Sequence, residues 1–157
     1  MKKIVIIGAN DFQNQLILKA KEMGFETHVF AWQDGSIGER TADHFYPVSI
    51  VEIDEILEKC REIKPDAVAT IASDLANITV SKVAAGLGLP GNTPECIELS
   101  TNKYAMRSAF LKAGLPTPKF YKVDRVIPEL MEMELPVIVK PTDRSGSRAI
   151  TKITAYD

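Results

Sequence analysis

The sequence contains little cysteine and few aromatic residues. Cys60 and Cys96 are the only cysteines among its 157 residues, and 7% of the residues are aromatic. Two cysteines cannot build a disulfide framework or a cysteine-based zinc site. We therefore interpret both as buried or half-buried thiols of a protein in the reducing cytoplasm.

Excess positive charge and long hydrophobic runs are also missing. The 19 basic and 21 acidic side chains give a net charge of −2 at pH 7. A nucleic-acid-binding surface needs a basic stripe, so nucleic acid is not an expected partner. The first apolar run, Ile4 to Ile7, ends at Gly8, which makes it too short for a signal peptide, and no run is long enough to span a membrane. The sequence predicts a cytoplasmic protein that does not act at a membrane.

The sequence does contain an alternation of strand and helix patterns. Short apolar or β-branched runs predict strands at residues 3–7, 26–30, 45–48 and 67–72, and apolar residues at helical spacing predict helices at 12–23, 53–63 and 75–87. Apolar strands that alternate with helices are typical of a parallel sheet covered by helices on both faces. We expect an α/β, Rossmann-like domain over residues 1–92.

Two prolines and a glycine within residues 89–94 indicate a domain boundary. Beyond it we expect two linker helices over residues 93–114, the first capped by Thr93 and the second near 102–113. The remainder, 115–157, predicts a strand at 119–123, a short helix at 128–133, a strand at 137–140, a turn at 142–148 and a last strand at 149–154. This second part is an α+β subdomain.

Three common sites are disfavoured by the residues present. A dinucleotide-binding turn needs three glycines, but only Gly8 is there, and Asn10 and Gln13 would obstruct a pyrophosphate. An oxidoreductase that uses a nicotinamide cofactor is therefore disfavoured. His28 and His44 are the only histidines, and we interpret both as structural, with no metal site predicted. No residue is predicted to be catalytic.

Two cationic features follow the linker. Lys140 ends an apolar strand and precedes a polar turn that contains Ser145, Gly146, Ser147 and Arg148. An ammonium group beside a Ser-Gly-Ser turn suits a polyphosphate, because the turn supplies hydroxyl and backbone N–H donors. Lys103 lies in the first turn of the second linker helix, where a cation is unfavourable unless an anion is near. The alternatives are an exposed turn and a solvated helix face with incidental charges.

These segments carry a resemblance to a known family. The run STNKYAMRSAFLKAGLPTPKF (residues 100–120) and the run LPVIVKPTDRSGSRAI (residues 135–150) resemble the ATP-grasp superfamily, in particular ligases similar to the carbamoyl-phosphate synthase large subunit, biotin carboxylase and the amino-acid ligases. The upstream pattern, which ends in GLGLPGNTPE (residues 86–95), resembles the Rossmann-like domain that precedes the ATP-grasp domain in these enzymes. The resemblance covers the whole chain.

The resemblance implies a nucleotide site and a cofactor. Lys103 would reach the phosphates of ATP, and Lys140 would lie beside the α-phosphate and the adenine. Ser145, Gly146 and Ser147 would form the loop over the β- and γ-phosphates, with Arg148 near it. The first domain would help to hold the substrate at the carboxyl ends of its strands, where Gly8, Asn10, Ser73 and Asp74 are weaker candidates. For these four, the alternative is an ordinary strand-to-helix turn.

The sequence also departs from the family pattern. Arg144 and Ala149 stand where the family's loop usually has glycines, and we expect them to stiffen it. No Glu or Asn follows Lys140, so the ligands for Mg are expected outside this chain. We therefore interpret the chain as the N-terminal part of a ligase that activates a small-molecule carboxylate as an acyl phosphate for attack by an amine or similar nucleophile.

That interpretation predicts that the chain is inactive alone. It also predicts that residues 115–157, an incomplete ATP-grasp subdomain, form a homo-oligomer. The rival hypothesis is a non-catalytic, Rossmann-like module that binds a small molecule or a partner.

Overall fold

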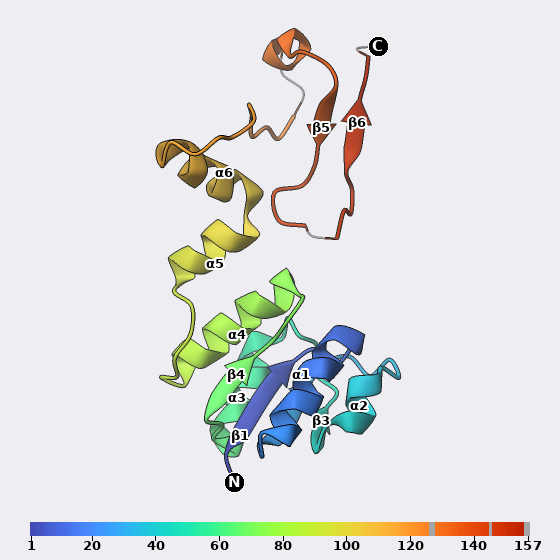
Figure 1. Ribbon diagram of the computed structural model, residues 1–157, viewed down its shortest axis with the longest axis vertical. Coiled ribbons are helices and arrows are strands. Elements are labelled where there is room, and N and C mark those ends of the chain that lie inside the picture. Colours follow the sequence, from blue (N-terminus) through green and yellow to red (C-terminus); the bar gives the residue numbers. More distant parts are fainter. Residues whose placement is uncertain (126–127, 145, 156–157) are drawn as a thin grey trace. The chain divides into compact units, whose positions relative to one another are not determined.

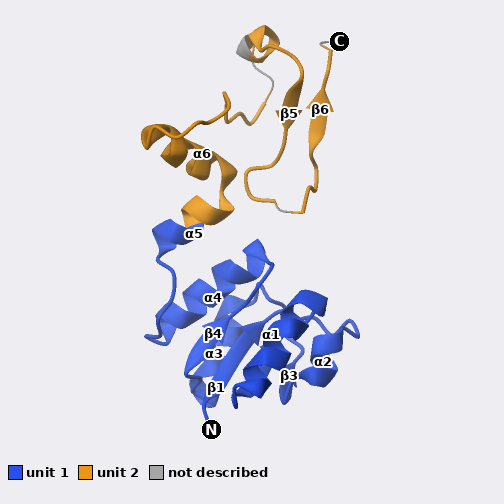
Figure 2. Ribbon diagram, in the orientation of Figure 1, with its two compact units in different colours: residues 1–97 blue, residues 98–157 orange. Residues whose placement is uncertain are grey.

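A computed structural model describes residues 1–125, 128–144 and 146–155. The chain divides into two compact units, residues 1–97 and residues 98–157 (Figure 2). The three-part division predicted from the sequence, 1–92, 93–114 and 115–157, stays a prediction. Among the described residues, none of the helices is both long enough and apolar enough to cross a membrane.

A four-stranded parallel sheet forms the centre of the first unit. Its strands are β1 (Lys3–Ile7), β2 (Glu26–Phe30), β3 (His44–Tyr46) and β4 (Ala67–Ala69), in the spatial order β3-β2-β1-β4. All three strand pairs are parallel, and Val5 in the middle of β1 pairs with His28 on one side and Val68 on the other. The predicted α/β class and the parallel sheet are confirmed.

Helices cover both faces of this sheet (Figure 1). Side chains alternate between the two faces of a strand, so Val5 and Ile7 pack in one core cluster and Ile6 in another. The first cluster includes residues of α3 (Ile53–Ile63) and α4 (Asp74–Gly86), and the second includes residues of α1 (Asp11–Glu22). The predicted two-sided packing is therefore present. Cys60 is buried in the first cluster, as expected, but the expectation of a buried or half-buried thiol is wrong for Cys96, which is exposed.

One helix of the first unit was not predicted. Helix α2 (Ile37–Thr41) begins at a capping box, in which Glu39 Oε1 accepts the amide hydrogen of Ser36 at 3.1 Å. Its Gly38 lies against Ala9, since a Cβ atom there would come within 2.5 Å of the Ala9 carbonyl oxygen. The helix depends on this close approach, which a pattern of apolar residues does not reveal.

The second unit contains short elements. It holds the second half of α5 (Pro94–Thr101), together with α6 (Lys103–Lys112), the 3₁₀ helix η1 (Pro128–Glu132) and an antiparallel pair, β5 (Val137–Val139) and β6 (Thr151–Ile153). The amide of Cys96 donates to Thr93 Oγ1 at 3.1 Å, which confirms the predicted cap of α5.

The strand predicted at 119–123 does not form. This segment instead packs through side chains against α6: the rings of Phe120 and Tyr104 meet edge to face at 5.6 Å, and Lys122 Nζ lies 5.5 Å from the centre of the Tyr104 ring. Pro116 and Pro118, just upstream, lack the amide hydrogen that a strand needs for pairing. The predicted strand at 119–123 is therefore wrong.

Candidate functional site

A cavity lies at the carboxyl ends of the parallel strands in the first unit. Its volume is about 150 Å³. The residues after β1, β2 and β4 all contribute to it, as expected for a sheet of parallel strands. The lining residues are Gly8, Ala9, Asn10, Gln13, Ala31, Trp32, Asp34, Ser36, Ile50, Ser73 and Ala76. Three of the four substrate candidates from the sequence, Gly8, Asn10 and Ser73, therefore come together at one cavity.

The turn after β1 is shaped by Gly8 and Asn10. Gly8 has φ = +101°, a conformation that favours glycine, and a Cβ atom there would come within 3.0 Å of Gln13 Cδ. Asn10 caps α1, because its Oδ1 accepts the amide hydrogen of Phe12 at 2.9 Å. The buried Gln13 side chain donates to the carbonyl of Ile71 and so ties this turn to the loop after β4.

The other side of the cavity is formed at the start of α4. Ser73 caps this helix by accepting the amide hydrogen of Ala76 at 3.2 Å. Asp74 is the first residue of the helix and is not among the residues that line the cavity. Ser73 and Asn10 thus both have a structural capping role, as in the ordinary strand-to-helix turn that was the alternative to a substrate site. Both residues also line the cavity.

The loop between β2 and α2 supplies lining residues that the sequence reading missed. Trp32 is 67% exposed, and Asp34 and Ser36 lie beyond it. Hydrogen bonds from the Ser36 side chain and amide lower the pKa of Asp34 below its ordinary value, so this carboxylate is charged at neutral pH. Among the residues that the structure describes, no lysine, arginine or histidine lines the cavity. The cavity can therefore hold a small polar ligand by hydrogen bonds, and its charge favours amine or hydroxyl groups.

Lys103 contacts the predicted phosphate loop in the second unit. Asn102 caps α6, since its Oδ1 accepts amide hydrogens from Tyr104 at 3.0 Å and Ala105 at 3.1 Å. The amide of Lys103 donates to the carbonyl of Thr142 at 2.8 Å, and its Nζ donates to the carbonyl of Arg144. The structure thus brings the start of α6 to the turn that follows β5.

Lys140 lies in the same part of this unit. It follows β5 directly, is exposed, and stands two residues before Thr142. Beyond it, Gly146, Ser147 and Arg148 are exposed, whereas Ser145 lies outside the described residues. Ser147 (φ = +57°) and Ala149 (φ = +54°) adopt the left-handed conformation that favours glycine. Ala149 is one of the positions where the family pattern has glycine. The backbone here therefore has a conformation that glycine adopts without strain, but the residue is alanine.

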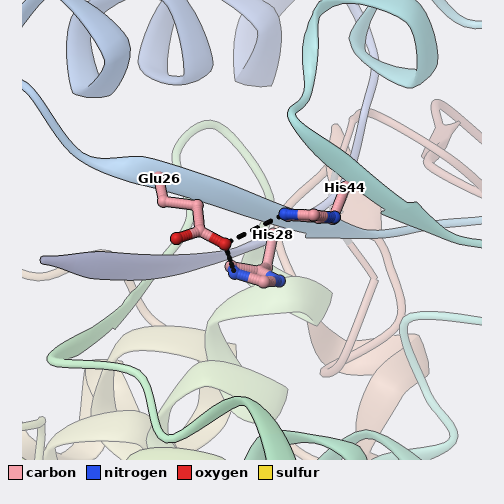
Figure 3. Close-up of side chains that lie close together, drawn as sticks. All are labelled: Glu26, His28 and His44. Carbon is pink, nitrogen blue, oxygen red and sulfur yellow. Dashed lines mark hydrogen bonds and ion pairs between the residues drawn. The ribbon is translucent and has the colours of Figure 1, made fainter. Parts of the chain in front are cut away.

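A third cluster, Glu26, His28 and His44, lies at the β2–β3 pair (Figure 3). Glu26 Oε1 lies 3.2 Å from His28 Nε2 and 2.9 Å from His44 Nε2, and the two imidazole rings stack with centroids 4.5 Å apart. Burial lowers the pKa of His28, although Glu26 opposes that shift. For Glu26, burial favours a higher pKa, but the hydrogen bond from His44 and the charge of Lys3 lower it overall. No local sequence pattern indicates that the two histidines meet.

Comparisons with known proteins identify the fold. No family model matches the chain. The formate-dependent phosphoribosylglycinamide formyltransferase of Prochlorococcus marinus subsp. pastoris is 22% identical over 152 residues, which are 94% of this chain and 39% of that protein. The crystal structure of phosphoribosylglycinamide synthetase from Anaerococcus prevotii is 27% identical with a TM-score of 0.72, and the match covers 98% of this chain and 39% of that one.

A third match comes from a structure with bound nucleotide. The biotin carboxylase domain of the Hydrogenobacter thermophilus 2-oxoglutarate carboxylase, solved with MgADP and bicarbonate, has a TM-score of 0.79 and 21% identity over 98% of this chain and 37% of that one. The resemblance to the N-terminal portion of ATP-grasp ligases is confirmed. The chain spans about two fifths of the length of these three proteins.

Proposed function

We propose that the chain is the N-terminal part of an ATP-dependent ligase that activates a small-molecule carboxylate for attack by an amine or similar nucleophile. The observation that carries the proposal is the contact of Lys103 with Thr142 and Arg144. Lys103 is one of the two lysines predicted to bind the nucleotide, and the loop that it contacts begins just after the other, Lys140. The proteins that the chain matches include ligases and a domain solved with MgADP.

The residues of the second unit fit a bound triphosphate. Lys103 occupies the first turn of α6, where no acidic side chain is present and where the helix dipole also favours an anion. Its Nζ gives one donor to Arg144, and an ammonium group has three. Lys140 and the Gly146–Arg148 segment add positive charge and hydrogen-bond donors beyond the end of β5. Bound ATP would supply the phosphoryl group that converts the carboxylate to an acyl phosphate.

The remaining parts of the active site belong to other chain segments in this proposal. After Lys140 the sequence has no Glu and no Asn, so the residues that bind Mg lie outside it. Charge neutralisation by the metal carries much of the catalysis in phosphoryl transfer. The chain alone would therefore bind ATP weakly and would have no ligase activity. A cytoplasmic location fits this activity.

The cavity of the first unit would hold part of the substrate. Asp34 is charged, and none of the described residues that line the cavity is cationic. We therefore assign the cavity to amine or hydroxyl groups of the substrate and place the reacting carboxylate elsewhere. Gly8, Asn10 and Ser73 line this cavity, whereas Asp74, the residue after Ser73, is not among the lining residues. All of the residues found to line this cavity belong to the first unit. A non-catalytic module that binds a small molecule would have the same arrangement.

Titration calorimetry with ATP tests the nucleotide site. Loss of one charge-assisted contact costs about 1.5–3 kcal/mol, so we expect Lys140→Ala to weaken ATP binding about 10-fold or more. Lys112→Ala, at the far end of α6, is the matched control and should leave the affinity within about twofold. Equal ATP affinities for the wild type and Lys140→Ala would contradict the proposal and favour the binding module.

Self-association is the proposed partner interaction. Strand β5 exposes apolar side chains, with Ile138 54% and Val139 55% exposed. A two-stranded pair of this kind is open to further strand pairing. Light scattering over a range of concentrations should show a dimer or larger species that Val139→Lys shifts toward monomer. A monomer at every concentration would contradict this part.

A further inference from the structure

The cluster of Glu26, His28 and His44 is built from two neighbouring strands. Glu26 and His28 stand two residues apart on β2, and residues with that spacing share one face of a strand. His44 begins β3 and pairs with His28 in the parallel register. The three side chains therefore converge on one point, as Figure 3 shows.

The geometry approaches that of a metal site. One ligand atom from each residue lies within 4.8 Å of the other two. An ion about 2.0–2.1 Å from each ligand atom requires ligand atoms about 3.3 Å apart in a tetrahedral site. Glu26 Oε1 already lies 3.2 Å from His28 Nε2 and 2.9 Å from His44 Nε2.

The two imidazoles differ in their freedom to move. The His28 side chain is 5% exposed and its Nδ1 lies 3.0 Å from the hydroxyl of Tyr46. A hydrogen bond at the second ring nitrogen is the usual way in which a protein orients a metal-binding histidine. The His44 side chain is 49% exposed, so its ring can leave the stack with His28 and turn its Nε2 toward an ion.

We propose that Glu26, His28 and His44 bind a divalent transition-metal ion, with Zn²⁺ as the preferred ion. Two imidazoles and a carboxylate form a donor set that suits Zn²⁺ better than Mg²⁺ or Ca²⁺, which prefer oxygen ligands. Three protein ligands leave one position for water. The ion would take the place of the hydrogen bonds that Glu26 now accepts from the two rings.

The proposed site is separate from the nucleotide and substrate sites. Glu26 and His44 are the first residues of β2 and β3, whereas the cavity lies where the parallel strands end. Lys3 is the cationic neighbour, since it pairs with Glu26 in the β1–β2 register, and its Nζ donates to the carbonyl of Ile63 at 3.2 Å. Bound metal would link the edge strand β3 to β2 and so would stabilise this edge of the sheet.

Calorimetric titration of ZnCl₂ into tag-free protein tests the site. Cys96→Ser serves as the background for every variant, because the exposed thiol of Cys96 is another zinc donor. The chain has two histidines, so imidazole binding has no other source. We expect one saturable site per chain, weakened at least 10-fold by His44→Ala and by Glu26→Gln. Glu22→Gln, an exposed carboxylate on α1, is the matched control and should bind as the background does.

Nuclear magnetic resonance of the imidazole nitrogens gives a readout that needs no variant. One equivalent of Zn²⁺ should shift the Nε2 resonances of both histidines together. The proposal is overturned by the absence of a saturable Zn²⁺ site, by shifts confined to one ring, or by His44→Ala and Glu26→Gln variants that bind Zn²⁺ like the background. Thermal unfolding without metal confirms that each variant is folded before the titrations are compared.

Discussion

The two units of the chain differ in how they are held together. In the first, two buried clusters lie on opposite faces of a parallel sheet, and Ile7, Phe30 and Ile56 are completely buried. In the second, no described residue is fully buried, and strands β5 and β6 have three residues each. Most of the stability of the described chain therefore comes from the first unit. The second unit carries the charged loop on short elements with little buried surface.

The largest expected effect comes from a core truncation in the first unit. Ile56→Ala removes a fully buried side chain on α3 and should lower the free energy of unfolding by about 2–5 kcal/mol. Ile138→Ala, the matched change in the second unit, removes a side chain that is 54% exposed and should cost no more than about 0.5 kcal/mol. Urea denaturation of the two variants measures the difference, and similar losses in both would break the comparison.

A glycine substitution tests the close packing of α2. A Cβ atom at Gly38 would lie 2.5 Å from the Ala9 carbonyl oxygen and 2.8 Å from Ala9 Cα. Gly38→Ala should therefore cost about 1–3 kcal/mol, and it should perturb the cavity that Ala9 lines. Gly91→Ala, where the nearest atom is Ala84 Cβ at 3.1 Å, is the milder control. Thermal unfolding that ranks the two variants equally would contradict the packing described for α2.

An acid titration tests the hydrogen bonds of Asp43. Burial favours a higher pKa, but the hydrogen bonds from Lys21 and Thr27 lower the pKa of Asp43 to about 2. Because the folded pKa lies below the ordinary value of 3.8, the stabilisation is present above about pH 4 and is lost as the pH falls through about 2. The side chain is 34% exposed, so the effect is about 1 kcal/mol after allowance for solvent screening.

Asp43→Asn should therefore flatten the pH dependence of stability between pH 4 and pH 2. Asp124→Asn, which removes an exposed carboxylate of the second unit, provides the comparison. Urea midpoints measured at several acidic pH values give both curves. An Asp43→Asn curve that parallels the wild type would show that these hydrogen bonds contribute nothing to stability.

The smallest effect is expected in the loop of the second unit. Ala149 has φ = +54°, so Ala149→Gly relieves an unfavourable backbone conformation. The added freedom of glycine in the unfolded chain offsets part of that gain, and the net stabilisation should be about 0–1 kcal/mol. Hydrogen exchange at the amides of β5 and β6 measures it, with Ala113→Gly at the end of α6 as a control. Faster exchange in Ala149→Gly would contradict the strained conformation.

Most of the first unit could be predicted from the sequence, because its strands and helices have clear apolar periods. Helix α2 could not, since its five residues are positioned by a cap at Ser36 and by the contact of Gly38 with Ala9. The Ser36 and Glu39 spacing of a capping box was the available signal. Missing this helix also concealed Trp32, Asp34 and Ser36 as lining residues of the cavity.

Residues of the cavity could be predicted where they follow the ends of predicted strands. Gly8, Asn10 and Ser73 follow strand ends, and the meeting of parallel strand ends at one edge follows from the fold. The meeting of His28 with His44 depends on the register between β2 and β3, which no local pattern reveals. Residues Glu26 and His28, two apart on a predicted strand, were the only local sign of that cluster.

In the proposed function, Lys103 and the loop after Lys140 hold the phosphates of one nucleotide. Calorimetry with ATP and with AMP on the wild type, Lys103→Ala and Lys140→Ala tests this arrangement. We predict that Lys103→Ala weakens ATP binding about 10-fold or more while AMP binding stays within about twofold, and that Lys140→Ala weakens both. Unchanged ATP affinity in both variants, or an equal loss of ATP and AMP affinity in Lys103→Ala, would contradict the claim.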